Sequence, residues 1–163
     1  MSIVAGCDVG SLTSKAVIMK DGKIIAKSII KSKPRPRDSA DGVMAEALAA
    51  ANLAMEDIVY CIGTGYGREQ ISFVKEVRSE ISCHGKGARW LLPSAQTVID
   101  IGGQDCKTMK IDKDGNVVRF IANDKCASGT GRFLEVMAKV LGMDIDSLGR
   151  MSARSRARRE WTR

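Results

Sequence analysis

The sequence predicts an α/β fold that contains two related halves. A short apolar run with β-branched residues, ending in Asp-x-Gly, occurs at 3–10 and again at 98–102. Both copies continue as strand, Asp-Gly turn and strand, and helical patterns lie between the copies and after the second. Because the same plan recurs at a fixed offset, we interpret it as an internal duplication.

The first copy begins with the strand-like run IVAGCDVG at 3–10, which leads into a tight polar loop. A second strand is expected at 16–19. The Asp-Gly pair in KDGK at 20–23 then predicts a hairpin turn into a third strand at 24–30.

Helical segments are expected between the copies. The alanine-rich stretch at 38–53 suits a helix that starts at residue 38 or 39, and the stretch at 81–92 suits another. Between them, DIVYCIGTGYG at 57–67 is typical of a strand that enters a glycine loop. The segment SKPRPRD at 32–38 should be a surface loop, because its two prolines cannot join a strand ladder.

The second copy, at 98–122, follows the first at an offset of 92 residues. The turn glycines, Gly22 and Gly115, fall one residue out of register. The positions that correspond are Asp8 with Asp100, Gly10 with Gly102, and Lys15 with Lys107.

Pro93 marks the expected boundary between the halves. Residues 1–93 are predicted to form the first half and 94–150 to begin the second. The remaining 151–163 are predicted to be a basic tail, disordered or aberrant, because they show no apolar periodicity. From Arg150 onward, six arginines stand against one glutamate, a net charge of +5 out of +7 for the chain. This basic end has no interleaved aromatic motif, so it does not favour a nucleic-acid partner.

The composition indicates a folded domain, because 44% of the 163 residues are hydrophobic. The N-terminal segment has no basic region before a long apolar run, and no window approaches 18 apolar residues. We therefore expect neither secretion nor a membrane span, and a cytoplasmic location. Five scattered cysteines without a C-x-x-C pair argue against a disulfide framework and against a local zinc site.

The two Asp-x-Gly loops are candidate phosphate sites. Phosphates need backbone N–H donors at close range, which glycine turns provide, and hydroxyls with a carboxylate suit a hydrated magnesium ion. Two such loops facing each other would grip a polyphosphate from both sides. The candidate ATP and Mg²⁺ residues are Asp8, Gly10, Ser11, Leu12, Thr13, Ser14 and Lys15 in the first loop and Asp100, Gly102, Gly103, Gln104 and Asp105 in the second.

This duplicated arrangement resembles the phosphate loops of the actin, sugar-kinase and heat-shock ATPase superfold, the actin-like (ribonuclease H-like, ASKHA) fold. A rival nucleotide signal, GTGYGRE at 63–69, departs in spacing from both the P-loop and the Rossmann pattern, and a tight strand-to-helix turn is the preferred interpretation. A sugar or acid kinase of the same superfold is an alternative function.

A helical pattern begins at Gly131, and Cys126 lies just ahead of it. Unpaired N–H groups and the positive dipole end of a helix favour a thiolate there and would stabilise an anionic iron–sulfur cluster. A buried small hydrophobe is the alternative for this cysteine. The apolar residues of the predicted helix fall on one face; they are Phe133, Val136, Met137, Val140 and Leu141.

The other cysteines carry weaker signals. Cys7, Cys61 and Cys106 lie in apolar or strand-like runs and are expected to be buried small hydrophobes. Cys83 and His84 are adjacent, but neighbours on a helix point apart, so we expect core packing or a helix start there.

Five ordered motifs connect these observations to a known family: DVGSLTSK, GTGYGR, SEISCHGKGA, IDIGGQD and NDKCASGTGRFLEVMA. Together they resemble the ATPase activators (component A) of 2-hydroxyacyl-CoA dehydratases and the related ATPase subunits of benzoyl-CoA reductase, the BadF/BadG/BcrA/BcrD-type ATPases. The resemblance runs from about residue 3 to about residue 151.

The resemblance implies a cytoplasmic homodimer from anaerobes, with one 4Fe–4S cluster shared between the subunits. In such activators ATP hydrolysis drives transfer of a low-potential electron to the dehydratase or reductase, with reduced ferredoxin or flavodoxin as the donor. Carried over by motif, the two loops take ATP and Mg²⁺, and Cys126 is the first cluster ligand. No catalytic residue is assigned.

Some family features have no counterpart here. The second cluster cysteine, the Gly-Gly adenosine motif and the closing helices lie beyond residue 151 in the family and are absent from this sequence. The second half is therefore expected to be incomplete and nucleotide binding weak. We interpret the chain as an incomplete copy of an activator; a small-molecule kinase and a non-catalytic remnant with exposed apolar surface are the alternatives.

Overall fold

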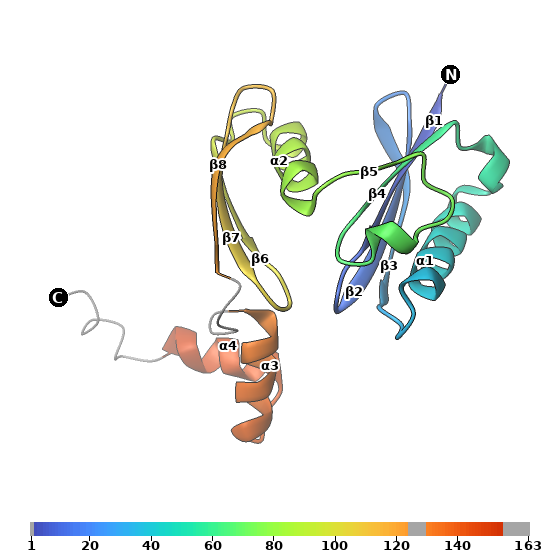
Figure 1. Ribbon diagram of the computed structural model, residues 1–163. Helices are drawn as coiled ribbons and strands as arrows, with labels where there is room; N and C mark the ends of the chain where they lie inside the picture. Colours follow the sequence, from blue (N-terminus) through green and yellow to red (C-terminus); the bar gives the residue numbers. More distant parts are fainter. Residues whose placement is uncertain (1, 124–129, 155–163) are drawn as a thin grey trace. The chain divides into compact units, whose positions relative to one another are not determined.

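The computed structural model describes residues 2–123 and 130–154. The strands and helices that the sequence predicts occur in the expected order, and the α/β class is confirmed (Figure 1). The short strand at 76–77 and the helix at 145–154 were not predicted. The elements are β1 (Ile3–Val9), β2 (Thr13–Lys20), β3 (Lys23–Lys31), α1 (Pro36–Ala51), the 3₁₀ turn η1 (Met55–Asp57), β4 (Tyr60–Thr64), the 3₁₀ turn η2 (Arg68–Gln70), β5 (Glu76–Val77), α2 (Glu80–Leu91), β6 (Thr97–Ile101), β7 (Cys106–Ile111), β8 (Val117–Asn123), α3 (Gly131–Val140) and α4 (Ile145–Arg154).

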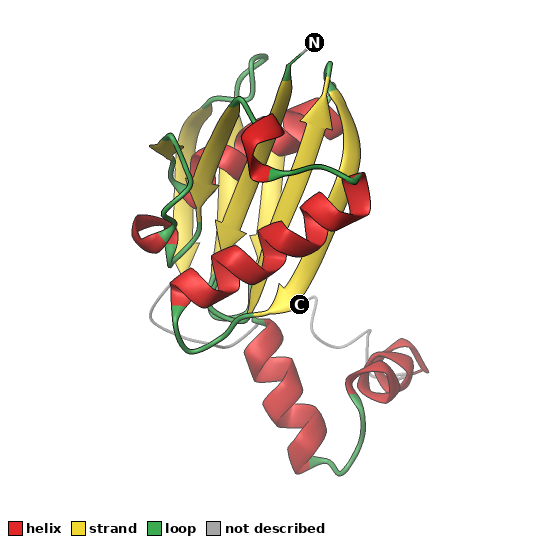
Figure 2. Cartoon of the chain, turned by 90° about the vertical axis from the view of Figure 1, so that its right-hand side faces the viewer, coloured by secondary structure: helices red, strands yellow, loops and turns green. Residues whose placement is uncertain are grey.

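The first sheet has the strand order β3-β2-β1-β4-β5. β1 pairs antiparallel with β2 and parallel with β4, so the sheet is mixed. Side chains alternate between its faces: Ala5, Cys7 and Val9 are buried on one face, and α1 lies across the strands on that face (Figure 2). Asp8 has the opposite parity and therefore points to the other face.

Apolar side chains of α1 fill the core of this first sheet. Val43, Met44 and Ala47 are at most 1% exposed and pack with Ile18 of β2. Burial of side chains of this size contributes about 1.5–3 kcal/mol each. The core therefore lies between α1 and the sheet.

The start of α1 corrects the sequence prediction. The helix begins at Pro36, two residues ahead of the expected start, so the second proline of 32–38 belongs to the helix rather than to a loop. Proline is favoured at the first helical position, because its φ is already helical and its missing N–H would have no partner there. Asn52 ends the helix with a left-handed φ of 52°.

The second copy forms a three-stranded sheet with the order β6-β7-β8. Its Asp-x-Gly turn repeats that of the first copy. The N–H of Gly10 donates to the Thr13 carbonyl at 3.2 Å, and the N–H of Gly102 donates to the Asp105 carbonyl at 2.9 Å. The hairpin glycines Gly22 and Gly115 both have φ of 76°. The Asp-x-Gly turns of the two copies therefore match, whereas the hairpin turns differ, because only the first also has a positive φ at its aspartate, 50° at Asp21. The duplication stays a prediction.

α2 packs closely on the β7–β8 turn. The helix begins after Ser79, whose hydroxyl accepts a hydrogen bond from the N–H of Ser82 at 3.2 Å. Lys86 Nζ donates to the Asp114 carbonyl at 2.9 Å, and Arg89 Nε donates to the Lys113 carbonyl at 2.8 Å. Two long cationic side chains thus hold the backbone of the turn.

The chain divides into two compact units, 1–98 with 109–119, and 99–108 with 120–163. The boundary expected at Pro93 separates the two related halves of the sequence, not these compact units, and it stays a prediction.

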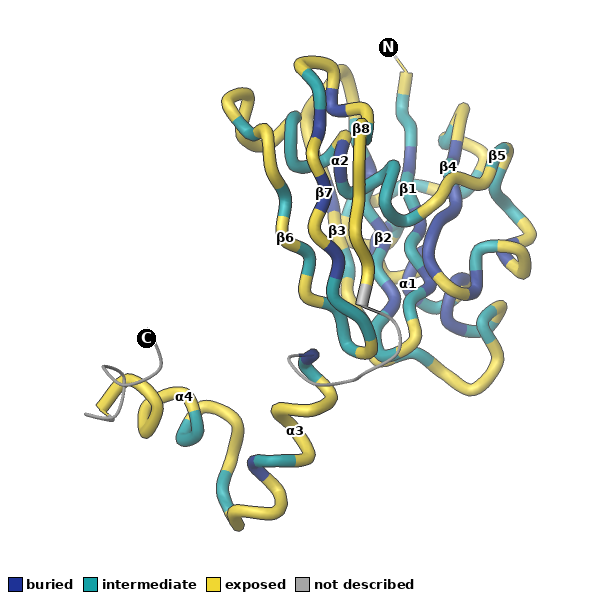
Figure 3. Tube along the Cα trace, turned by 60° about the vertical axis from the view of Figure 1, so that its left-hand side comes forward, coloured by how far each residue is buried: buried dark blue, intermediate teal, exposed yellow. Residues whose placement is uncertain are grey.

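Within the second unit, α3 begins at Gly131 as predicted, with Thr130 as its N-cap. α3 and α4 are mostly exposed (Figure 3). α4 extends to Arg154, so the first four residues of the predicted tail are helical, and 155–163 lie outside the described residues.

No helix within 2–123 and 130–154 is long and apolar enough to span a membrane.

Candidate functional site

The first loop joins β1 to β2 and is shorter than predicted, because Thr13, Ser14 and Lys15 already lie on β2. The strand register brings the two charged residues of this segment together. Asp8 lies directly opposite Lys15 in the antiparallel pair and beside Thr64 in the parallel pair with β4. Lys15 Nζ donates to Asp8 Oδ2 at 3.0 Å and to the Thr13 carbonyl at 3.2 Å. The carboxyl ends of parallel strands are where open α/β sheets bind ligands, and Asp8 lies at such an end.

The end of β3 fixes the direction of the first loop's peptides. Ser32 Oγ donates to the Gly10 carbonyl at 2.6 Å, and the N–H of Ser32 donates to the Leu12 carbonyl at 2.9 Å. Because a trans peptide is planar, the N–H of Ser11 points away from Ser32 when the Gly10 carbonyl points toward it. The buried Ser14 hydroxyl lies 2.9 Å from Ser32 Oγ and completes the network.

A cavity of about 1010 Å³ adjoins Asp8 and Lys15 within the first unit. Lys27, Arg78 and Lys86 also line it, so cations outnumber the single carboxylate on its wall. A cavity of this size is ample for a small-molecule ligand, and its charge suits an anion.

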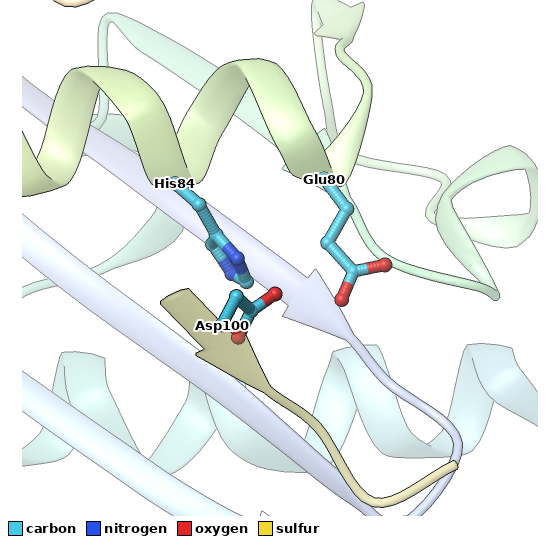
Figure 4. Close-up of side chains that lie close together, drawn as sticks. All are labelled: Glu80, His84 and Asp100. Carbon is cyan, nitrogen blue, oxygen red and sulfur yellow. The ribbon is translucent and has the colours of Figure 1, made fainter. Parts of the chain in front are cut away.

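Cys83 and His84 lie near the start of α2, as expected, and both also line this cavity. Figure 4 shows that Glu80 and His84, one turn apart, extend from the same side of α2. This spacing follows from the helical period of 3.6 residues.

One oxygen of Asp8 identifies a candidate cation position. Asp8 Oδ1 is buried and has no hydrogen-bond partner, while Oδ2 is held by Lys15. An unsatisfied buried carboxylate oxygen costs about 1–3 kcal/mol or more. Mg²⁺ prefers carboxylate oxygens and retains several waters, so this donor fits a hydrated magnesium ion that neighbours a phosphate.

The second loop is tied to α3 instead of to a strand. The N–H of Gly131 donates to the Gly102 carbonyl at 3.1 Å, and the N–H of Arg132 donates to the Gly103 carbonyl at 3.0 Å. These bonds satisfy two donors at the start of α3. By the same planarity, the N–H groups of Gly103 and Gln104 point away from the helix.

The charged residues of the second loop form their own ion pair. Lys107 Nζ lies 2.6 Å from Asp105 Oδ2, and the lysine side chain is buried. Asp100 lies on β6, half-buried, two residues ahead of Gly102. The structure thus brings Gly102, Gly103, Asp105 and Lys107 together around one turn.

The cysteines divide by environment. Cys7 and Cys61 are buried as expected, and burial raises the pKa of the Cys7 thiol to about 12 and that of Cys61 to about 11. Cys106 is half-buried, so its predicted full burial is wrong. Cys126, the predicted cluster ligand, lies outside the described residues.

Sequence reasoning missed two parts of this site. Ser32 follows β3 and gives no motif, since a serine after a strand is common. Thr64 and Gly65 were interpreted as a tight turn alone, although the turn packs against Asp8. The parallel pairing of two strands that both end in Gly-rich segments is the signal that would have placed them together.

Comparison with known proteins identifies the family of this chain. The model of the BadF/BadG/BcrA/BcrD ATPase family matches residues 5–163, a range that includes 151–163, which the motifs alone did not reach. The activator of lactoyl-CoA dehydratase from Anaerotignum propionicum is 47% identical over 146 residues, which is 90% of this chain and 56% of that protein. The chain therefore spans little more than half the length of the curated relatives it matches.

Solved structures agree on the fold. The (R)-2-hydroxyglutaryl-CoA dehydratase component A of Acidaminococcus fermentans superposes with a TM-score of 0.89 at 40% identity, over 95% of this chain and 60% of that one. The activator of the 2-hydroxyisocaproyl-CoA dehydratase from Clostridium difficile, with bound ADPNP, gives 0.86 at 42% identity, over 94% and 57%.

A hexokinase from Thermus thermophilus, at 11% identity and a TM-score of 0.54, shares the fold alone. The predicted actin-like ATPase fold is confirmed by these neighbours. With a family match over nearly the whole chain and several relatives above 40% identity, the chain belongs to the BadF/BadG/BcrA/BcrD ATPase family.

Proposed function

We propose that this chain binds Mg²⁺-ATP as part of an ATP-dependent activator of a 2-hydroxyacyl-CoA dehydratase or of a benzoyl-CoA reductase. The observation that carries the proposal is the pair of Asp-x-Gly loops, whose glycine N–H groups close turns of the same type. Support comes from relatives that are named as dehydratase activators and from one that holds ADPNP, an ATP analogue.

The chain's own residues have separate tasks in this proposal. The N–H of Ser11 and the N–H groups of Gly103 and Gln104 point away from the elements that anchor their loops and donate to phosphate oxygens. Lys15 neutralises phosphate charge, and Asp8 holds the hydrated Mg²⁺ through Oδ1. The hydroxyls of Ser11 and Thr13, with Asp100 and Asp105, complete the proposed phosphate and Mg²⁺ contacts.

The partners are part of the same proposal. Two copies form a homodimer and share a 4Fe–4S cluster, to which Cys126 contributes a thiolate ahead of α3. When bound, the cluster supplies a low-potential electron, which reduced ferredoxin or flavodoxin replenishes in the cytoplasm of an anaerobe.

Calorimetric titration with ATP, with and without Mg²⁺, tests the nucleotide part. We expect binding that strengthens when Mg²⁺ is present and a slow release of phosphate to water. The kinase alternative predicts phosphate transfer to a small acid or sugar instead, which thin-layer analysis of labelled γ-phosphate distinguishes. A protein that folds cooperatively and shows no heat of ATP binding at millimolar concentration would contradict the proposal.

Iron content tests the cluster part. Protein purified without oxygen is expected to carry iron and sulfide, and Cys126→Ala is expected to lose both, because one thiolate of the shared site is removed. Cys61→Ala is the matched control, since that thiol is buried in the core of the first sheet. Equal iron in wild type and Cys126→Ala, or none in either, would exclude this ligand assignment.

A further inference from the structure

The turn after β4 lies against the carboxylate of the first loop. Gly65 has φ of 89°, a conformation that side chains rarely adopt. A Cβ on this residue would overlap Asp8 Oδ1 and would lie 2.6 Å from the Val9 carbonyl oxygen. The oxygen that Gly65 adjoins is the one without a hydrogen-bond partner.

Several contacts fix this turn in place. The N–H of Gly67 donates to the Val9 carbonyl at 2.9 Å, and Arg68 Nη1 donates to the Gly65 carbonyl at 3.2 Å. A Cβ on Gly67 would meet Val9 Cγ1 at 2.7 Å, so this residue also tolerates no side chain. Thr64, which precedes the turn, donates to the Arg78 carbonyl at 3.0 Å. Hydrogen bonds therefore hold the turn on both sides.

The Asp8 carboxylate is consequently confined between two neighbours. Lys15 holds Oδ2 at 3.0 Å from the β2 side, and the backbone of Gly65 covers Oδ1 from the β4 side. An oxygen that is buried but unpaired is kept in position by shape and not by a hydrogen bond.

We propose that Gly65 is a positioning residue for Asp8, and that its missing side chain sets the direction in which Oδ1 meets the hydrated magnesium ion of a bound nucleotide. This inference rests on the proposed nucleotide function. A side chain at this position turns the carboxylate toward Lys15 and away from the metal. The alternative is that Gly65 serves only the positive φ of its turn.

Gly65→Ala and Gly22→Ala separate these two explanations. Gly22 has a similar φ of 76°, but a Cβ at that position would have no neighbour within 4 Å, so its variant carries the backbone strain without the overlap. We expect Gly65→Ala to weaken ATP binding by roughly tenfold or more with Mg²⁺ and by much less without it, because small misplacements of a site carboxylate have large effects. Gly22→Ala should leave the ratio of the two affinities at its wild-type value.

The proposal is overturned if Gly65→Ala unfolds at a lower temperature than wild type but keeps the wild-type ratio of ATP affinities with and without Mg²⁺. If the wild-type protein binds no ATP, the proposed function is refuted. The contact between Gly65 and Asp8 is then tested by measuring the free energy of unfolding of the variants. In that measurement, Gly65→Ala should destabilise the Asp8→Ala variant less than it destabilises wild type, because the overlapping oxygen is gone. Equal losses in both backgrounds would contradict a direct Gly65–Asp8 contact, and the same comparison applies if Gly65→Ala alone does not fold.

Discussion

Gly85→Val is expected to lower the free energy of unfolding by about 3 kcal/mol or more, which is a large part of the stability of a small domain. A Cβ on Gly85 would lie 2.8 Å from the Gly115 carbonyl oxygen and 3.1 Å from Val117 Cγ2. The nearest atom belongs to the backbone, so no side-chain rotation relieves the overlap. Urea denaturation followed by far-UV circular dichroism measures the loss.

Gly87→Val is the matched control, because Gly87 lies two residues along the same helix and has open space where its side chain would be. Replacing a glycine in a helix with another residue should be neutral or stabilising by up to about 1 kcal/mol. If the two variants lost equal stability, the close approach of α2 to the hairpin would not be the cause.

Asp8→Asn is expected to reduce the affinity for Mg²⁺-ATP by roughly tenfold to a hundredfold, because a neutral amide is a much poorer ligand for a hard cation. Affinity for ATP without Mg²⁺ should change little or improve, since Lys15 is then released from its partner and free to meet phosphate. Thermal stability should stay close to wild type, because the Asp8–Lys15 pair is partly exposed and such pairs contribute under about 1 kcal/mol.

Asp38→Asn serves as the control for the general effect of removing a paired carboxylate. Asp38 pairs with Arg35 at 2.8 Å at the start of α1, where both side chains are exposed. Its substitution should leave ATP affinity unchanged with and without Mg²⁺. An Asp8→Asn variant that binds Mg²⁺-ATP as tightly as wild type would remove the magnesium role from Asp8.

The repeated turns were predictable from sequence because each rests on local chemistry. An Asp-x-Gly after an apolar run and an Asp-Gly between two strands specify turns without help from distant residues, and turns occur at all four places, although the two hairpin turns differ in backbone conformation. The start of α2 was also close to its expected place, because Ser79 is a typical N-cap.

Other parts depend on tertiary contacts and were not predictable. Ser32 reaches the first loop only because β3 pairs with β2, and Gly65 meets Asp8 only because β4 pairs with β1. The apolar face predicted on α3 exists, but Val136 and Val140 are 43% and 72% exposed. Periodicity gives the face of a helix and not what covers it.

The hydrogen bonds from Lys86 and Arg89 to the turn between β7 and β8 bear on where this chain can be divided. The tip of the second repeat, 109–119, belongs to the compact unit of the first repeat. A polypeptide cut at Pro93 would retain α2 but lose the hairpin on which Gly85 packs. The helix and the hairpin therefore depend on each other for cover, although Pro93 separates them in the sequence.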